Sequence, residues 1–220
     1  MPERLLLLAP ELGRAFGETL LMLGIGLCAA AVLGGPLGVA LFLAGEGGSA
    51  RPRRAGQALG WLVNTVRAFP FLILVVALAP LTRVLAGTAI GPLAAAVPLS
   101  FVAVPCFAHL VEQQLREVPR GVIEAAHAMG ASRLQVVTRV LLVEARSGLV
   151  LALTVLAISF LSYAAVAGVV GGGGIGDLAL RHGYERFEAD VMAVTVAILV
   201  ALVQLIQFGG ARLARRLDKR

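Results

Sequence analysis

Four long stretches of this 220-residue sequence contain no Asp, Glu, Lys or Arg, and they constrain the fold more than any other feature. They are residues 19–44, 84–111, 147–176 and 191–211. A helix of about 20 apolar residues crosses the hydrocarbon layer of a bilayer, and it satisfies its own backbone hydrogen bonds there. The sequence therefore predicts an all-α membrane protein with at least four transmembrane helices.

A fifth span is expected at 58–81, although Arg67 interrupts it. Residues 69–81 are strongly apolar, but they are too short to cross a membrane alone. We therefore expect a transmembrane domain over residues 17–211, preceded by an outer segment, 1–16, and followed by a basic inner tail, 212–220. The expected spans are about 19–44, 58–81, 84–111, 147–170 and 191–211.

The composition excludes several other classes of protein. Hydrophobic residues make up 59% of the chain and charged residues 15%, whereas soluble domains average about 45–50% and 25%. The net charge of +6 comes from basic residues in short segments between apolar runs, without the interleaved aromatics of a nucleic-acid groove. We expect membrane lipid, and no nucleic acid, around the chain. Cys28 and Cys106 lie in apolar runs, which argues against a disulfide framework.

The distribution of Lys and Arg predicts the orientation of the chain. If the N-terminus is outside and the chain crosses five times, thirteen of the 19 Lys and Arg residues lie in inner segments and five in outer ones, with Arg67 inside a span. Segments that stay in the cytoplasm carry an excess of these residues. The sequence therefore favours an N-out, C-in topology.

The longest polar stretch on the predicted inner side lies between the third and fourth spans, at 112–146. Within it, four apolar residues recur at i, i+3, i+4 and i+7, which predicts one apolar face on a short helix. Pro119 suits the first turn of this helix, and Gly130 ends it. The four residues of this face are Val122, Ala125, Ala126 and Met129.

A second short helix is expected directly after Gly130. Ser132 and Gln135 have the spacing of a capping box, in which each side chain bonds the other residue's backbone N–H. The apolar face of the first helix is mostly alanine, so it would bury little area in lipid. An amphipathic helix resting on lipid headgroups is one interpretation, and the small residues favour a second one, close contact with a partner protein.

This stretch also resembles a known family motif. Glu124-Ala125-Ala126, followed by Gly130 and Val140-Leu141-Leu142, is similar to the EAA loop of bacterial ABC importer permeases, here about residues 116–143. In that family the loop forms a coupling helix that docks into a cleft on a cytoplasmic ATPase subunit. The resemblance implies that the residues that couple this chain to an ATPase are Glu124, Ala125, Ala126 and Gly130.

Other segments are similar to the methionine-import permeases of this superfamily. The resemblance implies the type I ABC importer permease fold, and the inner-membrane component of a binding-protein-dependent transport system. It also implies a homodimer, two ATPase subunits that bind ATP and Mg, and an extracytoplasmic methionine-binding protein or lipoprotein, with no cofactor in this chain. The similar segments are 64–71, 80–83, 115–126, 173–179 and 204–208.

Arg67 is the one charge expected inside a span, and Asn64 lies one turn before it. A charge in a span usually faces the bundle interior or a wet cavity, so the two residues are candidates for the transport pathway. The alternative is structural, because Arg67 could extend toward the inner headgroups or pair with a neighbouring helix. The sequence leaves both interpretations open.

The sequence offers no catalytic or metal-binding residues. His109, His127 and His182 lie far apart without further ligands at metal-binding spacing, and no phosphate-binding loop is present. The glycines of 171–176 fit a dinucleotide motif by spacing alone, and a close-packed turn after the fourth span explains them better. The prediction is therefore a transport subunit, not an enzyme, in a bacterial inner membrane.

Two other functions remain as alternatives at this point. A related permease could carry another amino acid or small solute, because methionine rests on resemblance and not on side-chain chemistry. A secondary transporter driven by an ion gradient would need ionisable groups at mid-membrane and often carries internal repeats, and neither is evident beyond Arg67. A membrane enzyme would need a polar catalytic cluster, which the sequence lacks.

Overall fold

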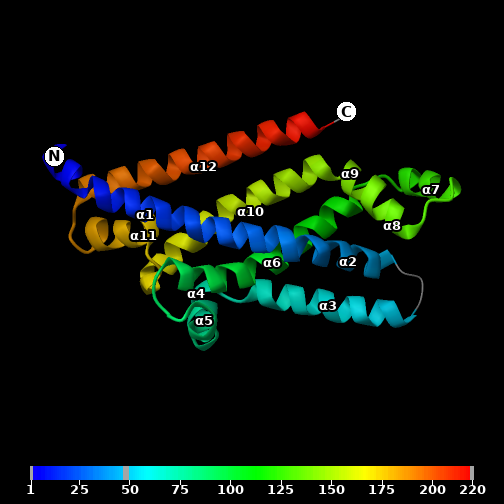
Figure 1. The fold of residues 1–220 in the computed structure, drawn as a ribbon, viewed down its shortest axis with the longest axis horizontal. Helices are drawn as coiled ribbons and strands as arrows, with labels where there is room; N and C mark the ends of the chain where they lie inside the picture. Colours follow the sequence, from blue (N-terminus) through cyan, green and yellow to red (C-terminus); the bar gives the residue numbers. More distant parts are fainter. Residues whose placement is uncertain (1, 47–49, 219–220) are drawn as a thin grey trace.

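The computed structural model describes residues 2–46 and 50–218, with the side chains of 8–45 and 56–218, and this part of the chain is helical without strands (Figure 1). Its first element is one long rod made of α1 (Pro2–Ala29), the π-helical segment η1 (Ala30–Gly34) and α2 (Gly35–Glu46). Residues 8–45 of this rod are long and apolar enough to cross a membrane. The π-helical segment ends two residues before Pro36, which cannot donate a backbone hydrogen bond to the helix.

The rod packs closely on α6 (Pro92–Arg116), the most buried of the long helices. A Cβ added at Gly34 would lie 2.6 Å from the carbonyl oxygen of Val104, and one at Gly38 would lie 2.5 Å from that of Ala108. The backbones of the two helices therefore approach to a distance that only glycine permits.

The expected span at 58–81 is not one continuous helix, because the chain bends within it. α3 (Ala50–Ala68) runs back beside α2, and α4 (Phe71–Ala77) leaves it at an angle of 101° (Figure 1). Pro70 causes the break, since it lacks an N–H and disfavours a helical conformation at Phe69. α5 (Ala79–Ala86) follows, so the residues of the expected second span form a bent pair of helices and the start of a third.

The third span also starts later than expected. Residues 84–86 belong to α5, and a turn with Gly87 at φ 73° and Gly91 at φ 99° separates them from α6. The helix begins only at Pro92, whose fixed φ suits a first helical position. The apolar run that begins at residue 84 therefore combines a turn of α5, a loop and the true span.

The last two long helices are α10 (Arg146–Ala167) and α12 (Ala189–Leu217), which pack against each other. Between them lie η3 (Gly168–Gly172), α11 (Gly174–Leu178) and η4 (Ala179–Tyr184). Positive φ at Gly171, Gly173 and Gly174 confirms the expected turn of close-packed glycines. The side chains of Glu18 and Thr19 accept the N–H groups of Gly174 and Ile175, each at 2.9 Å, and so bind this turn to α1.

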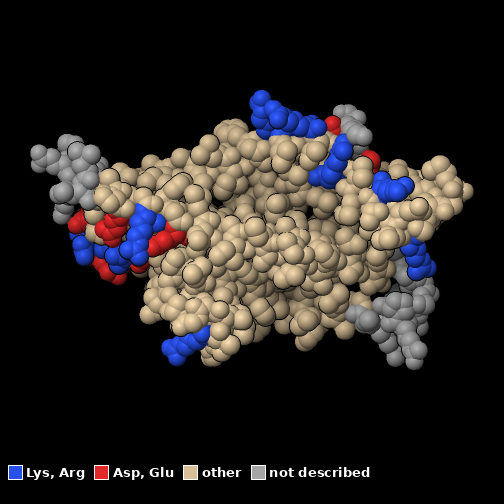
Figure 2. Space-filling model, viewed as in Figure 1, with Lys and Arg blue, Asp and Glu red and all other residues tan. Residues whose placement is uncertain are grey.

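The two ends of the bundle differ. The N-terminus and α11 lie at one end, called the N-terminal end below, whereas α7 (Arg120–Ala128) and the C-terminus lie at the other, the α7 end (Figure 1). Figure 2 shows acidic and basic side chains together at the N-terminal end, a broad uncharged band, and mostly basic side chains toward the α7 end. The described chain has four helices that could span a membrane, or up to five when the bent pair counts as one span.

Candidate functional site

The expected short helix of the polar stretch is α7, and it begins one residue after Pro119. Pro119 has an extended backbone, with φ −59° and ψ 131°, so the chain turns sharply where α6 ends. Pro119 precedes the first turn and does not belong to it, which is a shift of one residue from the expectation. Val118 is buried beside it and fixes the start of α7 on the core.

Gly130 ends α7, as predicted. The N–H of Ala131 bonds the carbonyl oxygen of Ala126 at 3.0 Å, and the N–H of Gly130 bonds that of His127 at 2.9 Å. These two bonds form a Schellman motif, which needs a left-handed residue at the position of Gly130. Its φ of 82° meets that need, and a Cβ added there would have no other atom within 4 Å. A substitution would therefore cost backbone strain but no clash.

The second helix begins with the expected capping box. The N–H of Ser132 bonds Gln135 Oε1 at 2.8 Å, and the N–H of Gln135 bonds Ser132 Oγ at 3.4 Å. This second helix is short and irregular. It consists of α8, a π-helical segment and a last short turn that ends just before α10. Its elements are α8 (Arg133–Gln135), η2 (Val136–Leu141) and α9 (Leu142–Glu144).

Only part of the predicted apolar face of α7 packs inward. Ala126 is 4% exposed and belongs to the core, with Ile123 half-buried beside it. Val122, Ala125 and Met129 are exposed, Met129 at 82%. Leu134 of α8, which the sequence reasoning missed, is also exposed, at 73%. An apolar surface on an end helix, outside the apolar band of the bundle, is typical of a protein contact.

The other predicted site residues lie at a separate place. Asn64 lines a cleft of about 550 Å³ between α2, α3 and α6, and Arg67 donates to Asn64 Oδ1 at 3.3 Å. His109, Glu112 and Gln113, which the sequence alone does not connect with Asn64, line the same cleft. Only the way α3 and α6 pack brings them together.

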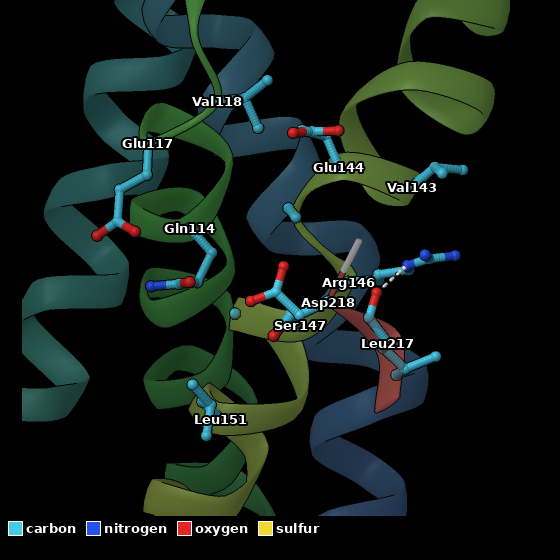
Figure 3. Close-up of a pocket in the computed structure, with 12 residues that line it drawn as sticks. Gln114, Glu117, Val118, Val143, Glu144, Arg146, Ser147, Leu151, Leu217 and Asp218 are labelled. Carbon is cyan, nitrogen blue, oxygen red and sulfur yellow. Dashed lines mark hydrogen bonds between the residues drawn. The ribbon is translucent and has the colours of Figure 1, made fainter. Parts of the chain in front are cut away.

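A smaller cavity of about 360 Å³ lies at the α7 end, where the ends of α6 and α12 meet α9 and the start of α10 (Figure 3). Arg146 Nε donates to the carbonyl oxygen of Leu217 at 2.8 Å, and Ser147 Oγ donates to that of Ala214 at 3.1 Å. The carbonyl of Leu217 lies in the last turn of α12, where helical N–H partners run out, whereas that of Ala214 also accepts the N–H of Asp218 at 2.9 Å. The two side chains attach the C-terminal end of α12 to the start of α10, which is the helix that follows α9.

Residues 34–220 match a family described as the binding-protein-dependent transport system inner membrane component. The chain belongs to this family. Members of this family are transport subunits and not enzymes. As the family description states an inner membrane component, the chain is a multi-pass protein of the bacterial inner membrane.

Relatives of this permease carry the names of methionine transport permeases. The probable D-methionine transport system permease protein MetI of Vibrio cholerae is 45% identical over 92% of this chain and 90% of the relative. The methionine import system permease protein MetP of Bacillus subtilis is 40% identical over 82% of this chain and 81% of the relative.

Solved structures support the same family. A chain from a structure of the inward-facing MetNI methionine ABC transporter is 41% identical and superposes with a TM-score of 0.92, and the match covers 100% of both chains. A chain from an amino acid ABC transporter, 19% identical with a TM-score of 0.71, shares the fold. This permease therefore has the all-α fold of the type I importers.

Proposed function

We propose that this permease forms, as a homodimer, the membrane pathway of an ATP-driven methionine importer. The names of its relatives and the titles of the matching structures support the substrate and the assembly. ATP and Mg bind to the partner ATPase subunits, and an extracytoplasmic binding protein delivers the amino acid. Energy enters through the ATPase, and the permease alternates between two conformations.

The proposed topology is N-out, C-in with five crossings, and the bent α3–α4 pair is the second crossing. In the structure, the rod and α6 run toward the α7 end, α10 runs back from it, and α12 ends there (Figure 1). The described side chains toward that same end are mostly basic, which supports its placement in the cytoplasm (Figure 2). Residues 17–211 then form the transmembrane domain, between the outer segment 1–16 and the basic tail 212–220.

The single observation that carries the proposal is the exposed apolar surface of α7 at the basic end of the bundle. In the proposed coupling, Ala126 anchors the helix to the permease core, and Ala125 lets the ATPase approach its backbone closely. Glu124 offers an exposed carboxylate to the partner, and Gly130 ends the helix. Movement of the ATPase reaches the spans through η2 and α9, which lead directly into α10.

Asn64 and Arg67 are proposed to face the transport pathway and not the lipid. Both are exposed in the isolated chain, at the last turns of α3 before the bend. Polar groups in contact with hydrocarbon are costly, so their surface faces water or protein.

Reconstituted vesicles test this function. The purified permease, its ATPase and its binding protein should accumulate labelled methionine only when ATP and Mg are present, and an ion gradient alone should give no uptake. Ala125→Trp should release the ATPase on purification, because a bulky ring prevents close approach to α7. Ala58→Trp, the same change at an exposed site on α3, should retain it. ATP-independent uptake, or an ATPase equally retained by both variants, would refute the proposal.

A further inference from the structure

Arg67 carries a charge without a carboxylate partner. Its guanidinium donates to Asn64 Oδ1 at 3.3 Å, and among the side chains of residues 8–45 and 56–218 no acidic group lies within 4 Å of it. α3 ends near the middle of the length of the bundle (Figure 1), where Arg67 is exposed. A charge at that depth is stable only beside water or an anion. An anionic ligand in a water-filled pathway would meet this need.

The cleft beside Arg67 has room for such a ligand. Its volume of about 550 Å³ falls within the range of about 300–1,000 Å³ that small-molecule sites occupy. Gly45, Gly56 and Gly60 line it, so parts of its wall are bare backbone. A Cβ added at Gly60 would meet no atom within 4 Å, which shows open space there.

The charges along the cleft are separated. Asn64 lines the cleft and accepts from Arg67, which adjoins the cleft there, and the charge of Arg67 also acts on His109 of α6, another lining residue. One turn nearer the end of α6, the Glu112 side chain is only 16% exposed and accepts from Arg116 Nη2 at 2.6 Å. Beside Asn64 the cleft thus adjoins a cation that has no carboxylate within 4 Å among the described side chains, and beside Arg116 it presents the largely buried carboxylate of Glu112.

We propose that this cleft binds a zwitterionic amino acid, whose carboxylate pairs with Arg67 and whose ammonium group faces Glu112. This inference rests on the proposed import function, because it places a substrate contact within the permease. A guanidinium binds a carboxylate through paired hydrogen bonds, so Arg67 is the specific anchor. The bound amino acid lies in the cleft between delivery at the outer face and release to the cytoplasm.

The test uses the complete permease–ATPase complex without its binding protein and a photoactivatable diazirine analogue of methionine. After irradiation, mass spectrometry should locate the label on the cleft segments of α3 and α6. Arg67→Gln should lower the labelling affinity by about 10- to 100-fold, because a charged hydrogen-bonding partner is lost. Arg67→Lys should retain part of it, and Gly60→Leu should abolish it by filling the cleft. Gly24→Leu, at an exposed site in α1 with equal open space, should label like the wild type.

Two outcomes would overturn the inference. One is labelling of the wild-type complex outside the cleft segments, or a labelling affinity of Arg67→Gln equal to that of the wild type. The other is a phospholipid held by Arg67 in native mass spectrometry with no labelling of the cleft, since the anion would then be a lipid phosphate. If the wild-type complex takes up methionine while either result holds, only the inference fails. If the wild type shows no ATP-driven uptake of methionine, the proposed function fails instead.

Discussion

Replacing Gly130 by alanine isolates the conformational requirement at the end of α7. The residue has φ 82°, and an added Cβ would touch nothing within 4 Å, so the substitution introduces strain without a clash. Holding an L-residue in the left-handed region costs about 1–2 kcal/mol. In the isolated Gly130→Ala permease, the last turn of α7 unwinds and the chain avoids this cost. A partner that binds only the intact helix forces residue 130 back into the left-handed conformation, so the cost then lowers the binding affinity.

The affinity of the permease for its ATPase should therefore fall by about 5- to 30-fold, the equivalent of about 1–2 kcal/mol. Binding of separately purified ATPase to permease in nanodiscs, measured by titration, gives this number. Gly87→Ala is the matched control, because Gly87 has φ 73° and equal open space but ends α5. It should show the same strain and unchanged ATPase affinity. Wild-type affinity in Gly130→Ala, or equal losses in both variants, would refute the reasoning.

Two further predictions concern the packing of the bundle. Gly38→Leu should lower the free energy of unfolding by about 1–3 kcal/mol, because its Cβ would lie 2.5 Å from the carbonyl oxygen of Ala108, and thermal unfolding against Gly24→Leu measures this difference. Thr19→Val should cost about 1–3 kcal/mol, because the buried N–H of Ile175 loses its acceptor. Faster hydrogen exchange at the Ile175 amide would report that loss, and an unchanged rate would contradict it.

Local signals predicted the polar stretch with more precision than the spans. Gly130 and the Ser132–Gln135 pair each act within a few residues, so the sequence shows where α7 ends and the next helix begins. The apolar spacing correctly placed a helix there. It could not show which members of that face pack inward, because this depends on where η2 lies against α7. In the structure Ala126 is buried and Met129 is exposed.

The hydropathy of the sequence indicated which segments are apolar, but not where the chain turns within them. The run from 84 to 111 reads as one span, yet a left-handed turn at Gly87 and Gly91 divides it. Pro70 marked a possible kink without giving its angle of 101°. Such a bend depends on how α4 packs against α6 and α10, which no local pattern records.

The polar cleft shows the limit of reasoning from one helix at a time. Asn64 and Arg67 were evident as polar residues in an apolar span. Their neighbours His109 and Glu112 lie more than 40 residues away, and the cleft exists only because α2, α3 and α6 meet with these faces toward one another. The rotation of each helix about its axis decides this, and it follows from tertiary packing.

The side of the membrane on which α7 lies, and what covers it, tests the account most directly. A single cysteine at Met129, with Cys28 and Cys106 replaced by alanine, would be treated with a membrane-impermeant maleimide. In inside-out vesicles the free permease should react, and bound ATPase should protect it, whereas right-side-out vesicles should give no reaction. Reaction from the outside, or equal reaction with and without the ATPase, would contradict the docking role of α7.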